Sequence, residues 1–280
     1  MKLSIITTAA LFLLSLTQPQ ILHADNPEKK HKTYFSLIDD ADRAIKEGNW
    51  MLAQETIQQA MRLEPSNPTN VLLLSNLGMI QFYDGRNEEA IKTLTTAHNI
   101  APKSVTVLMN RARLYTSTGQ PVLAEADYST VIQLDSTLIE PRFYRAILSL
   151  NAGRYDSAKA DVDTLAIMAP NDRLTNVAQA TLLMTLGDFN SAIPHLSKAI
   201  KIQPDAGYYA NRALCYLQIN DIALAAEDIA NGLSLDPTDP ELYIYRAMLN
   251  KMRYRPDDAK ADAETAIKFG ADPERIKKLL

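Results

Sequence analysis

Four arginines in this chain are each followed, sixteen residues later, by an aspartate. The pairs are Arg111–Asp127, Arg145–Asp161, Arg212–Asp228 and Arg246–Asp262. The planar guanidinium group can hold a carboxylate through two parallel hydrogen bonds, so this spacing predicts structural ion pairs. The alternative is that arginines at a regular spacing bind an anionic ligand. We favour ion pairs because every one of these arginines has a candidate partner.

A different pairing would join each aspartate to the next arginine along the chain, for instance Asp127 to Arg145. It leaves Arg111 and Arg212 without a preceding aspartate. Pairing at a spacing of sixteen residues is therefore the better interpretation.

Other residue types that carry chemistry are not gathered into a motif. The histidines, His23, His31, His98 and His195, lack the spacing of metal ligands on a helix, and the sequence contains no glycine-rich phosphate loop. Cys215, the only cysteine, lies in an apolar run and is expected to be buried. These observations predict a protein that is not an enzyme and has no cofactor and no metal site.

Composition and net charge limit the classes of partner that the chain is expected to bind. The 280 residues are 46% hydrophobic and 22% charged, as in ordinary globular proteins, and the net charge is −4. Nucleic-acid binders carry a basic surface, so no nucleic-acid partner is expected.

Residues 1–24 are typical of a secretory signal peptide. Lys2 precedes an apolar run from Ile5 to Leu16, and Ala24 provides a small residue for cleavage. The alternative, an uncleaved membrane anchor, would need roughly 20 apolar residues. We therefore expect an exported protein, in the periplasm or cell envelope or secreted, without a transmembrane span in the mature chain. Residues 25–33 would be a polar leader.

The elements that position the ion pairs follow from an internal repeat. Two series of small residues run in step along the chain, with successive spacings of 37, 34, 34, 34, 33 and 34 residues. The first series is Ala53, Ala90, Ala124, Ala158, Ala192, Ala225 and Ala259; the second is Ala41, Gly78, Ala112, Ala146, Ala180, Ala213 and Ala247. Small residues at fixed positions are needed where two helices cross closely.

Glycines and prolines share this period. Five glycines lie five residues before an alanine of the first series, and five prolines lie twelve residues after one. Each repeat therefore predicts two amphipathic helices with a turn between them and a stop at the end. The expected repeats are 34–67, 71–104, 105–138, 139–172, 173–205, 206–239 and 240–271, and residues 272–280 are expected to form a C-terminal capping helix.

A 34-residue helix–turn–helix unit with small residues at positions eight and twenty and proline at position thirty-two resembles the tetratricopeptide repeat. The resemblance covers about residues 34–271. It implies an all-α fold, an α-solenoid in which about seven repeats stack into a right-handed superhelix whose first helices line a concave groove.

By this resemblance, groove residues come from fixed positions of each first helix. The candidates are Asn76, Met79, Tyr83, Asn110, Arg113, Tyr144, Asn211, Gln218 and Tyr245. The resemblance therefore favours a protein that binds a protein or peptide partner in the groove. Two alternatives are a structural scaffold that uses the convex face or the edges, and a groove that binds a glycan.

One ligand class of the family can be tested on the sequence. Members that bind cytosolic chaperone tails carry a clamp of lysine, asparagine and arginine at five set positions over three repeats. Read from the first repeat, only Asn76 matches, and read from the second, only Asn110 matches. We therefore do not expect cytosolic chaperone C-terminal tails as partners.

Overall fold

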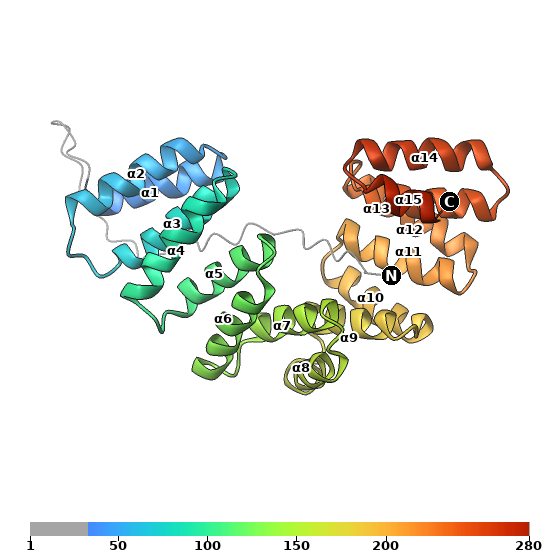
Figure 1. The fold of residues 1–280 in the computed structure, drawn as a ribbon, viewed down its shortest axis with the longest axis horizontal. Helices are drawn as coiled ribbons and strands as arrows, with labels where there is room; N and C mark the ends of the chain where they lie inside the picture. The colour runs from blue at the N-terminus through green and yellow to red at the C-terminus, as the bar shows by residue number, and fades with distance from the viewer. Residues whose placement is uncertain (1–32, 280) are drawn as a thin grey trace. The chain divides into compact units, whose positions relative to one another are not determined.

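The structure is a computed structural model that describes residues 33–279, and these residues form fifteen α-helices and no β-strand (Figure 1). The all-α prediction is confirmed. The predicted signal peptide and all but the last residue of the predicted leader lie outside the described residues. The helices are α1 (Tyr34–Lys46), α2 (Trp50–Leu63), α3 (Asn70–Tyr83), α4 (Asn87–Ile100), α5 (Val105–Ser117), α6 (Pro121–Leu134), α7 (Ile139–Asn151), α8 (Tyr155–Met168), α9 (Arg173–Thr185), α10 (Phe189–Ile202), α11 (Ala206–Gln218), α12 (Ile222–Leu235), α13 (Pro240–Met252), α14 (Pro256–Lys268) and α15 (Pro273–Leu279).

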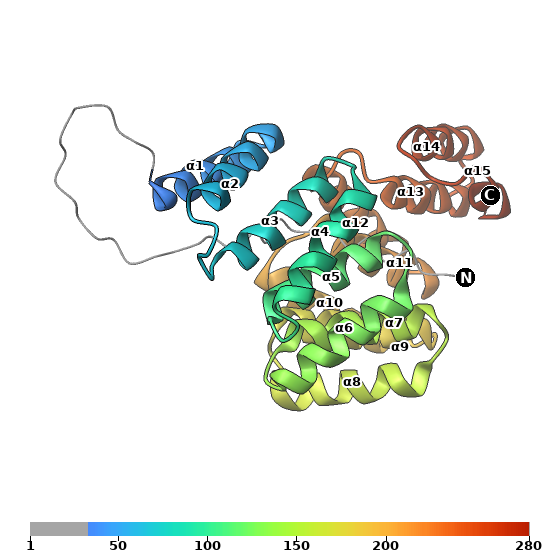
Figure 2. The same cartoon turned by 60° about the vertical axis from the view of Figure 1, so that its left-hand side comes forward.

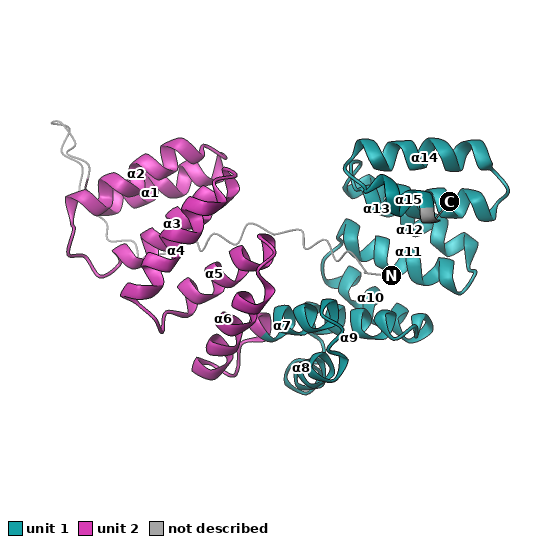
Figure 3. Cartoon of the chain, viewed as in Figure 1, with its two compact units in different colours: residues 1–8, 142–280 teal, residues 9–141 magenta. Residues whose placement is uncertain are grey.

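The described residues divide into two compact bodies (Figure 3). The N-terminal body comprises residues 33–141 and the C-terminal body residues 142–279, so the division falls inside α7. In the N-terminal body the helices of a repeat pack as hairpins, α1 with α2, α3 with α4 and α5 with α6 (Figure 2). In the C-terminal body α9 packs with α10, α11 with α12 and α13 with α14. First helices of neighbouring repeats also touch, as α3 does with α5 and α11 with α13.

Helix ends follow from local sequence. Side chains of Asn49, Asp188 and Asp221 accept a hydrogen bond from a backbone N–H in the first turn of the following helix. This contact satisfies a donor that has no partner within the helix. Pro256 occupies the first turn of α14, where its missing N–H costs nothing. Pro194 instead lies inside α10, and the helix continues through it.

The turn between the two helices of a repeat requires one residue with a left-handed backbone. A glycine takes that conformation in five of the seven described hairpins, as at Gly187 with φ of 84°. Asn220 (φ 62°) and Tyr254 (φ 56°) take it in the other two. Only glycine adopts this conformation without a steric cost.

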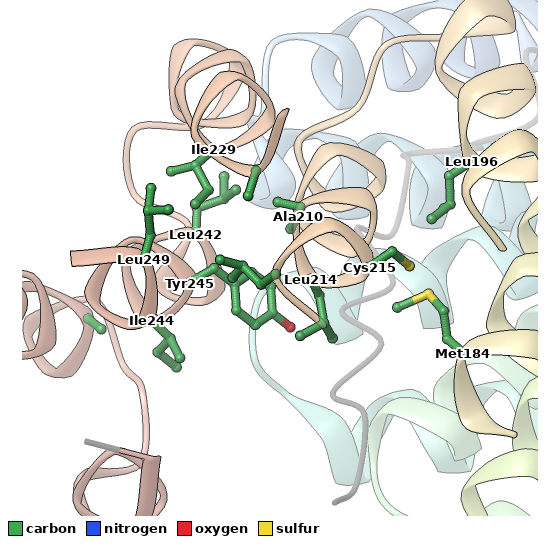
Figure 4. Packing of buried hydrophobic residues seen from close by; sticks show 14 of the residues in the cluster. Met184, Leu196, Ala210, Leu214, Cys215, Ile229, Leu242, Ile244, Tyr245 and Leu249 are labelled. Carbon is green, nitrogen blue, oxygen red and sulfur yellow. The ribbon is translucent and has the colours of Figure 1, made fainter. Parts of the chain in front are cut away.

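The core of each hairpin forms where small residues let the two helices approach. Ala124, Ala192 and Ala213 are fully buried, as are most members of both small-residue series. Large apolar side chains fill the space beside these contacts. In the C-terminal body they form one cluster that includes Met184, Leu196, Leu214, Cys215, Ile229, Leu242, Ile244, Tyr245 and Leu249 (Figure 4).

The last helix, α15, packs on the C-terminal body. Its Ile276 is 5% exposed and belongs to the same apolar cluster. Arg275 of this helix donates hydrogen bonds to both carboxylate oxygens of Glu241 at the start of α13, one of them at 2.6 Å. One apolar contact and one bidentate ion pair thus hold a short helix that could not be stable alone.

We expect Gly78→Ala to destabilise the chain, because a Cβ atom at this position would lie 2.6 Å from Cγ of the fully buried Leu94. Overpacking lowers the free energy of unfolding by about 1–3 kcal/mol, and the better helix propensity of alanine raises it by at most about 1 kcal/mol. Chemical denaturation should therefore give a free energy of unfolding lower by about 1 kcal/mol. An unchanged or higher value would show that α3 and α4 can separate without loss.

Candidate functional site

The structure places each of the four arginines against the aspartate sixteen residues later in the chain. Nε and Nη2 of Arg212 donate to Oδ2 and Oδ1 of Asp228 at 2.8 and 2.7 Å. The pairs Arg111–Asp127 and Arg145–Asp161 have the same two-bond geometry, with distances of 2.7–2.8 Å. In every pair the arginine belongs to the first helix of a hairpin and the aspartate to the second.

The fourth pair is arranged differently. Nε and Nη2 of Arg246 both donate to Oδ1 of Asp262, at 2.9 and 2.5 Å. The other oxygen, Oδ2, accepts a hydrogen bond of 2.9 Å from Asn250, which the spacing alone does not indicate. Asp262 is thus satisfied on both oxygens while its side chain is only 9% exposed.

Arg212 is turned inward, with a side chain that is 18% exposed, whereas the side chain of Arg246 is 39% exposed. Arg212 also donates from Nη1 to the hydroxyl of Ser197 at 2.8 Å, and its guanidinium carbon lies 5.7 and 5.9 Å from the ring centres of Tyr209 and Tyr216. The hydrogen bond to Asp228 raises the pKa of the Arg212 guanidinium, against the opposing effect of partial burial. A guanidinium with these contacts serves the fold, and the geometry gives no support to an anion site at this position.

One of the three repeats without the arginine has a different contact at this place. In the fifth repeat the corresponding residues are Gln179 and His195. His195 pairs through Nδ1 with Oδ1 of the fully buried Asn176 at 3.2 Å. Burial lowers the pKa of His195, and the charge of Lys198 lowers it further, so the neutral ring is the favoured form.

Three of the groove candidates in the N-terminal body are buried. Asn76 and Asn110 are each 7% exposed and Met79 is 4% exposed. Met79 packs with Leu94 and Leu114 in an apolar cluster. Position within the repeat predicted an open surface for these side chains, but successive first helices pack closely and enclose them.

Asn110 takes part in a polar row that crosses three first helices. Its amide nitrogen donates to Oγ of Ser75 on α3 at 3.0 Å. Its amide oxygen accepts from Nη1 of Arg113 at 3.3 Å, and Nη2 of Arg113 donates to Oε1 of Glu140 on α7 at 2.5 Å. Exposure rises along this row, from 0% at Ser75 to 24% for the Arg113 side chain and 37% for that of Glu140. The Ser75–Glu140 row therefore begins in the core and ends at the surface.

Tyr83 adds an aromatic group beside this row. Its ring stacks on that of Trp50, with centres 5.7 Å apart and an interplanar angle of 26°. Burial raises the pKa of the Tyr83 phenol, and the positive charge of Arg113 opposes the shift. Half-buried aromatic rings next to a half-buried arginine form a surface suited to a peptide.

Candidates in the C-terminal body differ in exposure. Tyr245 is 6% exposed and lies in the core, where burial raises the pKa of its phenol (Figure 4). Its placement in an open groove is not supported, because α15 packs on this part of the fold. Tyr144 and Asn211 are half-buried, and Gln218 is exposed.

The described residues hold no group of three or more potential metal-binding side chains. Among the same residues no helix is both long and apolar enough to span a bilayer. Cys215 is fully buried, and desolvation raises the pKa of its thiol to about 12. His23 and His31 lie outside the described residues.

Some contacts in the structure were not predicted from the sequence. The pair Arg113–Glu140 joins two different repeats over 27 residues, and Glu241–Arg275 joins the last repeat to the capping helix over 34 residues. Stacking of the Arg212 and Arg246 guanidinium groups on Tyr209 and Tyr243, three residues earlier, was also missed. A Tyr-x-x-Arg spacing places both side chains on one face of a helix, so that signal was available.

Comparison with known proteins gives consistent matches to one family. The family profile described as tetratricopeptide repeat matches residues 177–240. A crystal structure of a tetratricopeptide repeat protein from Parabacteroides merdae ATCC 43184 is 30% identical, with a TM-score of 0.72, and the match covers 88% of this chain and 97% of that one.

Curated relatives match over shorter stretches. Human tetratricopeptide repeat protein 13 is 28% identical over 43% of this chain, and mouse DnaJ homolog subfamily C member 7 is 33% identical over 35%. The matched segments span 15% and 20% of those two proteins, so most of each relative has no counterpart here.

We expect Asp228→Ala to cost about 3–5 kcal/mol of unfolding free energy, because it leaves the Arg212 charge partly buried without its carboxylate. The double variant Arg212→Met, Asp228→Leu should lose much less, since no unpaired charge remains. Thermal or chemical denaturation of both variants measures the difference. Equal losses in the two variants would contradict the inward-facing role of Arg212.

The raised pKa of Cys215 predicts a thiol that stays protonated in the folded chain. A disulfide reagent at pH 8 should react with it on the order of a thousandfold more slowly than with the chain unfolded in urea. Absorbance of the released thiolate follows both rates. Rapid reaction in native buffer would mean that α11 opens readily.

Proposed function

Because the chain belongs to the tetratricopeptide repeat family, we propose that it is a non-catalytic protein that binds a protein or peptide partner through its first helices. Proteins built from stacked repeats present an extended surface made of one helix from each repeat. The single observation that carries the proposal is the Ser75–Glu140 row in the N-terminal body, in which Arg113 contacts a carboxylate whose side chain is 37% exposed.

Arg113 differs from the four arginines of the structural pairs. Those arginines hold aspartate side chains that are 3–9% exposed, whereas Arg113 contacts a carboxylate whose side chain is 37% exposed. Exposed ion pairs contribute only about 0–1 kcal/mol, so a partner's carboxylate or backbone carbonyl can replace Glu140 at little cost. The nearby rings of Tyr83 and Trp50 supply apolar contact area.

In the C-terminal body, Asn211 is the candidate best placed to join this function. Its amide can donate to and accept from a peptide backbone, and it is half-buried. Tyr144 and Gln218 also keep accessible surface and remain candidates. An envelope or extracellular setting is part of the proposal and rests on the signal-peptide pattern of residues 1–24 alone.

The test is capture of partners from a cell-envelope extract by the chain without its predicted signal peptide. We expect Arg113→Glu to weaken capture about tenfold or more, because it replaces the cation that would bind the partner's carboxylate with a negative charge that repels it. Asn211→Ala should weaken it less, since it removes a neutral hydrogen-bonding group. Quantitative mass spectrometry of the captured proteins gives the ratios.

Lys159→Ala is the matched control. Lys159 lies on a second helix and forms an exposed pair with Asp163, so its loss should leave capture unchanged. Circular dichroism must show the same helix content in all variants. If neither Arg113→Glu nor Asn211→Ala reduces capture, the face of the first helices is not the binding surface.

A further inference from the structure

The turn between α13 and α14 contains a bulky residue in a conformation that favours glycine. Tyr254 has φ of 56°, where five other hairpins of the described chain have glycine. Its N–H donates to the carbonyl of Lys251 at 3.1 Å, and the next N–H, of Arg255, donates to that of Asn250 at 2.9 Å. Gly187 and Asp188 make the same two bonds in the fifth repeat. Tyr254 thus occupies a glycine position without any change in the turn.

This backbone conformation is unfavourable for tyrosine, and packing of the Tyr254 ring within the described chain does not compensate for it. A side chain in the left-handed conformation costs about 1–2 kcal/mol relative to glycine. The tyrosine is 94% exposed, so its ring packs against almost nothing. The folded chain alone therefore gives no physical reason for an aromatic side chain here.

Residues around the ring have the character of a contact surface. Residues 251–258 are all exposed, and Lys251, Arg253 and Arg255 place cations on both sides of Tyr254. Met252 adds an apolar side chain that is 38% exposed. Tyrosine, methionine and arginine are enriched at protein–protein interfaces, and tyrosine and arginine carry much of their binding energy.

We propose that residues Lys251–Arg255, the end of α13 and the turn after it, are an interaction site for an acidic segment of a partner protein, with the Tyr254 ring as its anchor. Arg255 holds a carboxylate of the segment through paired hydrogen bonds, and Arg253 adds the donors not used in its 3.4 Å hydrogen bond from Nη2 to the Ile222 carbonyl. The ring covers an adjacent apolar side chain. This site lies on the turn edge of the last hairpin and is independent of the surface proposed for the first helices.

The charge balance favours a protein over a lipid surface. Anionic membranes are recognised by clusters of about four to eight cations. This turn has three, and Asp257 and Asp258 follow in the first turn of α14. Attraction is therefore short-ranged and depends on direct arginine–carboxylate contact.

Binding of a fluorescein-labelled peptide to the full chain tests the proposal. The probe is a short peptide in which glutamates alternate with leucine and phenylalanine, and its control has lysine in place of each glutamate. We expect the acidic peptide to bind and the lysine peptide not to bind. Tyr254→Gly should weaken binding about tenfold, and the double variant Arg253→Glu, Arg255→Glu should abolish it.

Stability separates this role from a structural one. Tyr254→Gly relieves the left-handed strain, so its melting temperature should rise by about 2–4 °C while binding falls. Asn220→Gly, at the same position of the sixth hairpin, is the matched control and should leave binding unchanged.

Three results would overturn the proposal. One is equal binding of the acidic peptide by wild type and Tyr254→Gly, and another is no preference for the acidic peptide. The third is binding to phosphatidylglycerol vesicles that depends on Tyr254 when the peptide does not bind, which would assign the turn to a membrane surface.

Discussion

Close approach of two helices at a small residue is the contact on which every repeat of this chain depends. In the third repeat, Ala112 and Ala124 are fully buried. Arg111 is the neighbour of the first alanine, and Asp127 lies one turn beyond the second. The short distance between the helices at the alanines is what brings guanidinium and carboxylate within hydrogen-bonding distance. A larger residue at either alanine would separate both the apolar contact and the ion pair.

The same close packing, repeated between hairpins, decides which side chains can meet a partner. First helices of successive repeats touch, and this contact takes Asn76, Met79 and Asn110 out of solvent. What remains accessible in the N-terminal body are longer side chains such as Arg113, which extend past the contact. Side chains at turns also stay accessible, as Tyr254 does with 94% of its surface exposed.

Much of the fold could be predicted from the sequence because the repeats of one chain can be compared with each other. Alanines at a constant spacing indicate helix pairs, and arginine and aspartate that are absent from the same repeats indicate a pair. Burial of Tyr245 could not be predicted in this way. It depends on α15, a single helix with no counterpart in the other repeats. The Arg113–Glu140 contact could not be predicted from the sequence either, because it joins different repeats and has no equivalent at the same positions of other repeats.

The structural ion pairs are unevenly distributed between the two bodies. Arg111–Asp127 belongs to the N-terminal body, and the other three pairs belong to the C-terminal body. Water binds charged groups less favourably as temperature rises, so the penalty for burying such pairs falls on heating. Apolar packing, in contrast, weakens on cooling. On heating, the C-terminal body with its three pairs therefore gains more from this fall than the N-terminal body, while cooling weakens the apolar clusters of both bodies.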